Sequence, residues 1–267
     1  MSSPELLRYD LAPGVLAFST TRRGGVSKGQ YGEFNINRHC GDNAADIAEN
    51  GRLLCQQLGI AGDRLVMPHQ THGTVVRRIS ADFFVLDAAS REAFLDGVDA
   101  IMTDISGVCV GVSTADCIPV LLCDTARHAC CAVHAGWRGT VERIVCKAVD
   151  ALCEAYGTRP ADLRTVIGPG ISLDSFEVGD EVYDRFAAAG FDMPAISRRM
   201  PAFCGDGDKW HIDLWTCNRL QLERCGVPPS AIHLAAIDTF THHDMFFSAR
   251  RLGIKSGRIF NGIVINY

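Results

Sequence analysis

The chain has 267 residues, 47% of them hydrophobic, and a formal net charge of −5. This composition is typical of a globular protein, and it lacks the excess of Lys and Arg that nucleic-acid binding requires. No apolar run approaches the roughly 20 residues that span a bilayer, and the N-terminus does not resemble a secretory signal. We therefore expect a cytoplasmic protein that binds neither nucleic acid nor a membrane. A monomer is favoured because no exposed apolar stripe stands out.

The spacing of apolar residues predicts strands and helices that alternate along the chain. A strand over 15–20 leads into a glycine-rich loop, 23–29, and a helix over 46–58 ends at Gly59. Short strands follow over 74–79, 99–103, 108–113, 119–123 and 129–134. The remaining elements are a helix over 140–156, a strand over 165–167, helices over 179–189 and 213–225, and strands over 232–237 and 259–265.

These elements predict a fold of the α/β (α+β) class. Several neighbouring strands have connections too short for a helical crossover, so a purely parallel sheet is not expected. Mixed β-sheets layered between outer helices fit the order of elements better. No change of composition divides the chain, which predicts a single domain over 1–267. The 12 cysteines include no Cys-x-x-Cys motif, and we expect them to be reduced and mostly buried.

Three short segments each offer one ligand for a soft metal. They are His-Gln-Thr-His-Gly with His72, Thr-Ala-Asp-Cys-Ile-Pro with Cys117, and His-Ala-Gly-Trp-Arg-Gly with His134. Two imidazoles and one thiolate are typical of a zinc ion that keeps its fourth position open for chemistry. Their wide separation excludes a compact zinc finger, whose ligands come in close pairs. It favours a catalytic site assembled from the ends of several strands.

Residues beside these ligands extend the candidate site. Asp116 directly precedes Cys117, and its carboxylate could accept a proton or orient a ligand. Gly136 and Gly139 flank a Trp-Arg pair after His134, which predicts a backbone that approaches something closely. Other histidines, at 69, 242 and 243, compete for a role that the sequence does not assign.

Segments distributed along the chain resemble one family in order and spacing. They are 24–27, 69–73, 96–100, 114–122, 134–140, 167–172, 176–179, 246–251 and 257–258. The family was long labelled multicopper polyphenol oxidoreductase, or laccase, and is now understood as zinc-dependent purine nucleoside phosphorylases with adenosine deaminase activity. The resemblance covers about 20–267. It implies a single α/β domain, zinc ligands at His72, Cys117 and His134, and a nucleoside and phosphate as substrates, with the preferred nucleoside left open.

The implied reaction requires an anion site, a purine pocket and a proton donor or acceptor. Arg138 is the main candidate for contact with phosphate or substrate, and the loop from Arg23 to Ser27 could add backbone donors. Arg250 is a further candidate. For deamination, water activated by zinc would attack the purine, and Asp116 could hold the released proton.

The chain departs from the family pattern at two positions, and three other readings stay open. Gly170 and Asp238 stand where the family often has cysteine. Copper could substitute for zinc in a polyphenol oxidase, but the nine histidines form no His-x-His motif. A metal-free hydrolase would use Cys117 as nucleophile and His134 as base. A structural zinc site would require a fourth protein ligand.

Overall fold

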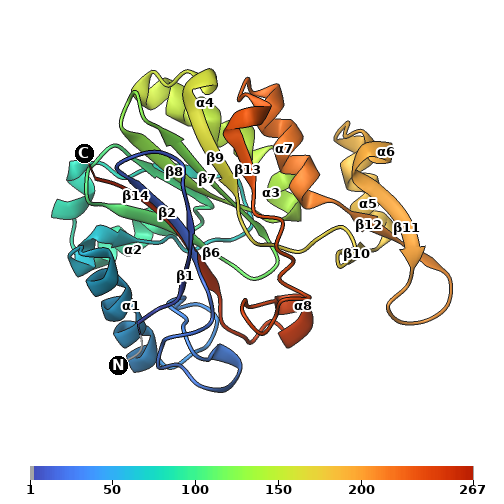
Figure 1. The fold of residues 1–267 in the computed structure, drawn as a ribbon, viewed down its shortest axis with the longest axis horizontal. Helices are drawn as coiled ribbons and strands as arrows, with labels where there is room; N and C mark the ends of the chain where they lie inside the picture. Colours follow the sequence, from blue (N-terminus) through green and yellow to red (C-terminus); the bar gives the residue numbers. More distant parts are fainter. Residues whose placement is uncertain (1–2, 267) are drawn as a thin grey trace.

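Two large β-sheets form the centre of the structure, a computed structural model that describes residues 3–266 (Figure 1). The five-stranded sheet has the order β1 (Leu6–Tyr9), β2 (Val15–Thr20), β14 (Ile259–Ile265), β6 (Cys109–Thr114) and β3 (Leu65–Val66). The six-stranded sheet has the order β13 (Ile232–Leu234), β9 (Leu163–Ile167), β7 (Ile118–Asp124), β8 (Ala129–Ala135), β5 (Ala100–Thr103) and β4 (Val76–Arg78). Each sheet contains both parallel and antiparallel pairs, so the predicted mixed sheets are confirmed.

Strands β7 and β8 lie in the middle of the six-stranded sheet and are buried along their whole length. In β7, Val120 and Leu122 face one hydrophobic cluster, whereas Leu121 and Cys123 face the cluster shared with the five-stranded sheet. A strand covered on both faces needs apolar residues at every position, which explains the continuous apolar runs. Only the ends of these strands reach polar surroundings.

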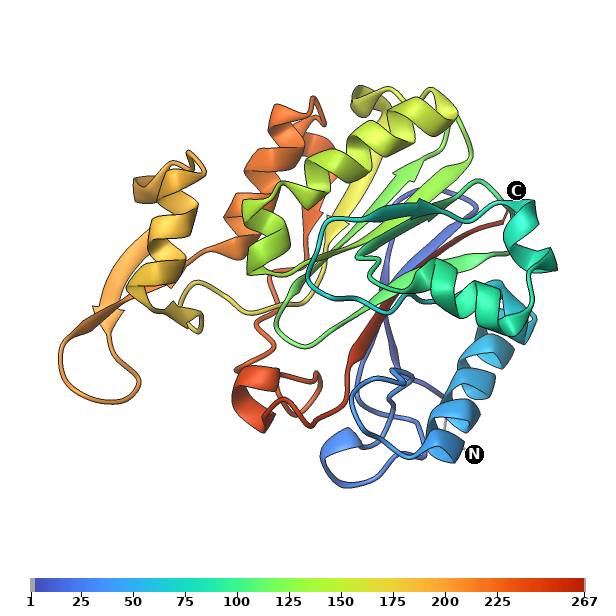
Figure 2. The same cartoon turned by 180° about the vertical axis from the view of Figure 1, so that it is seen from behind.

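Helices cover the outer face of each sheet, as predicted. Helix α1 (Ala44–Leu58) packs Leu54 against Phe18 and Phe260 of the five-stranded sheet. Asn43 caps its first turn, and Gly59 ends it with φ 68°, in the left-handed region that favours glycine. The six-stranded sheet is covered by α3 (Trp137–Val141), α4 (Ile144–Tyr156) and α7 (Leu214–Arg224). The layers are therefore helix, sheet, sheet and helix, which Figure 2 shows from behind.

A smaller unit projects from this layered body (Figure 1). We call residues 177–212 the projecting segment. It contains β10 (Glu177–Val178), α5 (Asp180–Ala188), α6 (Met193–Ile196), β11 (Ser197–Pro201) and β12 (Asp208–Ile212), with the strands in the antiparallel order β10-β12-β11. The remaining helices are α2 (Ala88–Leu95), α8 (Ala249–Leu252) and five 3-10 turns, at Gly29–Tyr31, Gly62–Arg64, Ala81–Val85, Pro160–Asp162 and Pro229–Ala231.

Two predicted elements need correction, and two strands of the projecting segment were missed. The single helix expected over 140–156 is wrong, because Arg143 takes a φ of 64° and separates α3 from α4. The strand expected over 232–237 ends at Leu234. Strands β11 and β12 were not predicted, since most of their side chains are polar and partly exposed.

Two expectations about the chain as a whole can be compared with the structure. No helix in the described part of the chain is long and apolar enough to cross a membrane. All 12 cysteines are free thiols, as expected for a reduced protein. Six of them are buried, and Cys204 is exposed.

Candidate metal centre

His72, Cys117 and His134 meet at one end of the six-stranded sheet. Cys117 directly precedes β7, and His134 lies in β8 opposite Pro119. The antiparallel pairing therefore carries both side chains to the same end of the hairpin, and His72 reaches them from the loop before β4. One ligand atom from each of the three residues lies within 4.8 Å of the others.

The carboxylate of Asp99 holds two of the three ligand segments. One oxygen lies 2.7 Å from Nδ1 of His134 and accepts from the amide of His72 at 3.0 Å. The other accepts from the amides of Thr71 and Gly73, at 3.2 and 2.7 Å. A proton on Nδ1 of His134 leaves its Nε2 lone pair for a metal. The same bonds hold His72 at a φ of 63°, a conformation that is strained for this residue type.

The charges at the centre favour a thiolate. Burial raises the pKa of Cys117, but His134 and His72 outweigh it and lower the pKa from 9.0 to about 6. Burial lowers the pKa of His134, but Cys117 and Asp99 raise it to about 9. The pKa of Asp99 is lowered, because hydrogen bonds from His134 and from the backbone amides outweigh its burial. A thiolate is the form of cysteine that binds metals.

The surroundings of the three side chains fit a metal ion that is reached from one side. Gly136 lies against the centre, where an added β-carbon would be 3.0 Å from both Sγ of Cys117 and Cδ2 of His72. His134 is buried and His72 is exposed. Within residues 3–266 this is the only group of three or more such side chains that could hold a metal. One thiolate and two imidazoles suit zinc or copper.

The Asp116 side chain connects the metal centre to the C-terminal segment. It is 9% exposed, and its two oxygens accept from the hydroxyl of Thr239 at 2.7 Å and from the amide of Arg250 at 2.6 Å. Burial raises the pKa of this carboxyl. These bonds describe an anchoring role, and the expected role as a proton acceptor stays a prediction. Thr239, which supplies the hydroxyl donor, directly follows Asp238, one of the two departures from the family pattern.

The second departure, Gly170, is explained by its close neighbours. A β-carbon at this position would lie 2.5 Å from Cδ1 of Ile118 and 3.1 Å from the carbonyl oxygen of Asp116. A larger residue would therefore require Ile118 to move. The Asp238 carboxylate, in turn, accepts from the hydroxyls of Ser172 and Ser175.

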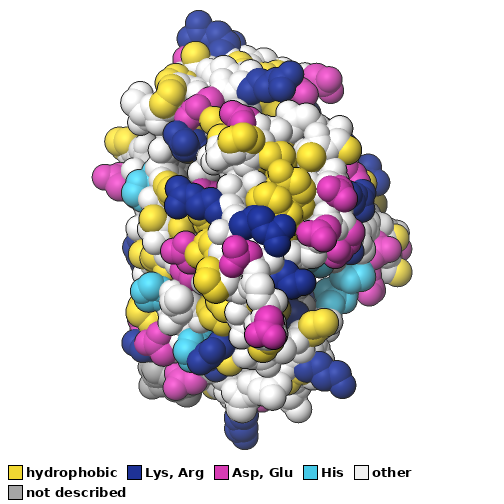
Figure 3. Space-filling model, turned by 90° about the vertical axis from the view of Figure 1, so that its right-hand side faces the viewer, with side chains coloured by type: hydrophobic (Ala, Val, Ile, Leu, Met, Phe, Trp, Pro, Cys, Tyr) yellow, Lys and Arg dark blue, Asp and Glu magenta, His cyan; other side chains and the backbone are white. Residues whose placement is uncertain are grey.

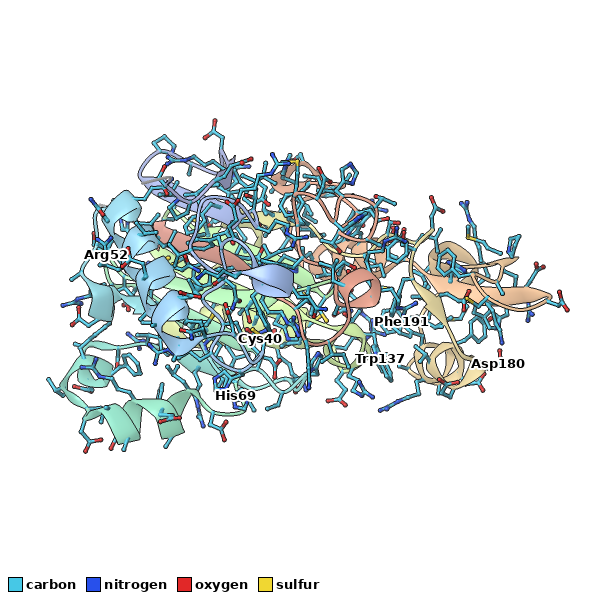
Figure 4. All side chains as sticks on the ribbon, turned by 90° about the horizontal axis from the view of Figure 1, so that it is seen from below. Cys40, Arg52, His69, Trp137, Asp180 and Phe191 are labelled. Carbon is cyan, nitrogen blue, oxygen red and sulfur yellow. The ribbon has the colours of Figure 1, made fainter. Side chains whose placement is uncertain are left out.

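Arg138 follows Gly136 of the metal centre by two residues, at the start of α3. It lies 4.4 Å from the centre of the Trp137 ring, and Trp137 follows Gly136. Arg185 of α5 was not among the predicted site residues, but its guanidinium lies 5.4 Å from the same ring. Neither arginine forms a salt bridge with another described residue. Trp137 lies where the projecting segment joins the body, near Phe191 (Figure 4).

The glycine-rich loop is held by hydrogen bonds within the protein. The hydroxyl of Ser27 donates to Asp42 at 2.7 Å, and its amide donates to the carbonyl of Glu33 at 2.8 Å. The amides of Gly24 and Val26 also donate within the protein. These groups are bonded within the protein, and the phosphate contact expected for this loop stays a prediction.

The other candidate cations and histidines also have partners. Arg23 lies 3.5 Å from the Asp244 carboxylate, and the Arg250 guanidinium donates to the carbonyl of Glu177 at 3.0 Å. The remaining histidine contacts are His69 with Asp96 at 2.6 Å, His242 with the carbonyl of Asp238 at 3.0 Å, and His243 with the carbonyl of Phe240 at 3.2 Å. No shared site forms from this set.

Known proteins resemble the chain over most of its length. A purine nucleoside phosphorylase from Bacteroides thetaiotaomicron is 47% identical over 249 residues, which is 93% of this chain and 91% of that protein. Adenosine deaminase RL5, from an unknown prokaryotic organism, is 42% identical over 262 residues, or 97% and 98% of the two chains. The crystal structure of Bacillus licheniformis hypothetical protein YfiH superposes with a TM-score of 0.89 at 27% identity, covering 99% and 97%.

The family model described as multi-copper polyphenol oxidoreductase laccase matches residues 16–266. That range contains the three metal-ligand candidates, Asp99 and every strand of the six-stranded sheet. The named relatives are nucleoside enzymes, so the support is for an enzyme that processes nucleosides. The chain belongs to the multi-copper polyphenol oxidoreductase laccase family, whose members include proteins named as purine nucleoside phosphorylases and an adenosine deaminase.

Proposed function

We propose that the chain is a zinc-dependent purine nucleoside phosphorylase that also deaminates adenosine. The observation that carries this proposal is the convergence of His72, Cys117 and His134 to within 4.8 Å. Three ligands of this type are the usual set for catalytic zinc. The names of the relatives supply the substrate class, a purine nucleoside with phosphate or water. Adenosine, inosine, guanosine and methylthioadenosine are the candidate nucleosides.

Each residue of the centre has a distinct task in this proposal. A bound zinc ion would supply a Lewis acid that polarises an oxygen atom of a reactant. Cys117 contributes negative charge to the site, and Asp99 fixes the tautomer and orientation of His134. His72 is the exposed member of the three, and substrate would approach the metal from its side. Asp116 is proposed to hold a proton, and the raised pKa of its carboxyl supports that role.

Phosphate is proposed to bind beside Trp137. Arg138 and Arg185 place two guanidinium groups over that ring without an acidic partner among the described residues. Guanidinium groups bind phosphate oxygens through paired, charge-assisted hydrogen bonds. The pair would orient phosphate for attack on the ribose while the base leaves.

Metal analysis combined with product detection tests the proposal. Purified protein is analysed for bound metals and then incubated with adenosine and phosphate. Adenine reports phosphorolysis and inosine reports deamination. His72→Ala and Cys117→Ala should lose the zinc and both activities, whereas the exposed Cys204→Ala should keep them. Full activity in a variant with verified zinc loss would contradict the proposed zinc-dependent mechanism.

A metal-free thiol hydrolase is the second candidate, because the structure contains a Cys–His–Asp series. Cys117 has a pKa of about 6 beside His134, and His134 is hydrogen bonded to Asp99, as a thiolate nucleophile requires. Such a series does not need His72, which favours the metal. Alkylation separates the two: a zinc-bound thiolate reacts much faster after chelation, whereas a free nucleophile reacts equally fast with or without a chelator.

A copper-dependent polyphenol oxidase is supported only by the description of the family. Residues 3–266 offer one candidate metal group, whereas a multicopper oxidase needs several. Copper nevertheless binds such ligands more tightly than zinc does, so it could replace zinc in purified protein. Phenol oxidation by zinc-loaded and by copper-loaded protein should both be negligible compared with nucleoside turnover.

A further inference from the structure

A buried histidine outside the metal centre lacks one hydrogen-bond partner. The side chain of His211, in β12, is 1% exposed. Its Nδ1 lies 2.9 Å from the carbonyl oxygen of Leu173, so Nδ1 donates, and Nε2 keeps a lone pair in the neutral ring. No described residue donates to Nε2. A buried acceptor is rarely left unpaired, and a donor from outside the chain would complete the hydrogen bonding of this nitrogen.

Two phenylalanine rings form an aromatic group with His211. The Phe203 ring packs against His211, with centroids 5.5 Å apart and planes at 69°. It also stacks on Phe240, at 5.9 Å and 18°. Phe203 lies in the turn between β11 and β12, is 50% exposed, and donates its amide to the Glu177 carboxylate at 2.7 Å. An aromatic ring on an exposed turn thus covers a second ring and an unpaired acceptor.

The backbone connects this aromatic group to the metal centre along two routes. Phe240 directly follows Thr239, whose hydroxyl donates to the carboxylate of Asp116 at 2.7 Å. Leu173 lies two residues beyond Ile171, whose amide donates to the carbonyl of Asp116 at 2.8 Å. The residue after Asp116 is the cysteine of the metal centre. The segments that carry Phe240 and Leu173 are therefore both hydrogen bonded to Asp116, the residue before this ligand.

We propose that Phe240, Phe203 and His211 form the subsite for the purine base. The inference rests on the proposed function and assigns residues to its base pocket. A purine ring is flat and stacks on aromatic faces, and adenine and hypoxanthine each carry an N–H donor on the six-membered ring. That donor would pair with Nε2 of His211 while the base stacks on Phe240.

Phe203 acts as the cover of this subsite. Its ring already contacts Phe240, so the turn between β11 and β12 has to lift before a base can enter, and it then closes on the base. The turn belongs to the projecting segment. Figure 3 looks onto that side of the molecule, where hydrophobic side chains reach the surface between charged groups of both signs.

Truncation of the cover tests the stacking. Phe203→Ala in the zinc-loaded enzyme should raise the KM for adenosine and inosine about tenfold. Phe203→Tyr, which keeps an aromatic ring, should have the wild-type KM. The KM for phosphate and the zinc content should not change. Phe84→Ala, a truncation of a ring outside the site, is the matched control. A nucleoside KM within twofold of wild type in Phe203→Ala would overturn the proposal.

Replacement of the histidine tests the hydrogen bond. In His211→Asn the amide nitrogen can still donate to the Leu173 carbonyl, but the acceptor at the Nε2 position is lost. The KM for adenosine and inosine should rise about tenfold. Purine riboside has no N–H on its six-membered ring, so its KM should change little. An equal rise for purine riboside would show that His211 does not accept from the base.

Direct binding separates this inference from the proposed function. If wild-type protein turns over no nucleoside, the proposed function fails on its own. Calorimetric titration with adenine and with unsubstituted purine still measures the subsite in that case. Weaker adenine binding in both Phe203→Ala and His211→Asn supports the subsite, with purine affected only by Phe203→Ala. Unchanged adenine binding in both variants overturns it.

Discussion

At the scale of single residues, the Asp99 carboxylate orders the metal centre more than any ligand does. It is completely buried and satisfies three backbone amides and one imidazole. It therefore fixes the loop that carries His72 and the ring of His134 in one arrangement. A carboxylate in this position raises the basicity of the ligand imidazole and fixes its tautomer.

We expect Asp99→Asn to keep the fold and weaken metal binding. The amide oxygen can still accept some of these bonds, but its charge is lost and its nitrogen meets a backbone donor. Loss of such a partner typically lowers metal affinity about 10- to 100-fold. Competition with a zinc chelator of known affinity measures the change, and circular dichroism confirms the fold. Wild-type zinc affinity in the variant would contradict the role.

Gly136 offers a steric test of the same centre. Its backbone, at φ −66° and ψ 167°, is open to any residue, so a substitution acts only through its β-carbon. In Gly136→Ala that atom would lie 3.0 Å from the Cys117 sulfur and the His72 ring, and we expect the ligands to be displaced and zinc binding to fall. Gly62→Ala, where nothing lies within 4 Å, is the control. Stoichiometric zinc in Gly136→Ala would contradict the geometry.

The three ligands were predictable from sequence, whereas Asp99 and Arg185 were not. Two histidines and one cysteine, each in a distinctive local segment, form a typical ligand set for catalytic zinc, so their combination stood out. Aspartate before a strand is common, and its partner His134 lies far along the chain, on β8. Arg185 comes from the projecting segment, and only the docking of α5 brings it over Trp137. Such contacts depend on tertiary packing that no local pattern records.

At the scale of elements, the prediction succeeded where burial dominates. The core strands are buried on both faces, so their apolar runs identify them. Helix α1 was recognised from its apolar stripe and its terminal glycine. The β11–β12 hairpin is held mainly by its own pairing and has few buried side chains, so its sequence lacks a clear alternation. The break at Arg143 leaves no sequence signal either, because arginine rarely adopts a positive φ.

Helix α1 carries a glycine that the fold does not require. Gly51 lies in the middle of the helix, and a β-carbon there would meet nothing within 4 Å. Gly51→Ala should raise the free energy of unfolding by about 0.5–1 kcal/mol, because alanine loses less backbone entropy in a helix. Urea denaturation measures the change, with nucleoside turnover expected to stay at the wild-type value. An unchanged or lower free energy of unfolding would mean that the helix needs glycine here.

At the scale of the whole molecule, the metal centre and the cores are separate. The three ligands lie at the end of the six-stranded sheet, whereas the cores lie between the layers. We expect chelated protein to lose activity yet keep its secondary structure and unfold cooperatively. Excess zinc should raise Tm, since ligand at a thousand times its Kd adds about 4 kcal/mol. Loss of structure on chelation, followed by circular dichroism, would instead indicate a structural zinc site.

The two proposed activities allow the phosphate site to be tested within one enzyme. Phosphorolysis uses phosphate and deamination uses water, so a residue that binds phosphate should affect only the first. Arg138→Gln and Arg185→Gln should each raise the KM for phosphate about 10- to 100-fold, because each variant loses a charge-assisted hydrogen bond to phosphate. The kcat/KM for adenosine deamination should stay the same.

Arg199→Gln is the matched control for these variants. Like Arg138 and Arg185, Arg199 lies over a tryptophan ring, but that ring is Trp210 of the projecting segment, at 5.2 Å. An equal loss of both activities in Arg185→Gln would mean that Arg185 acts on the nucleoside or on the docking of α5. An unchanged KM for phosphate would remove Arg185 from the site. A selective effect would show that the projecting segment and the layered body bind phosphate together, on either side of Trp137.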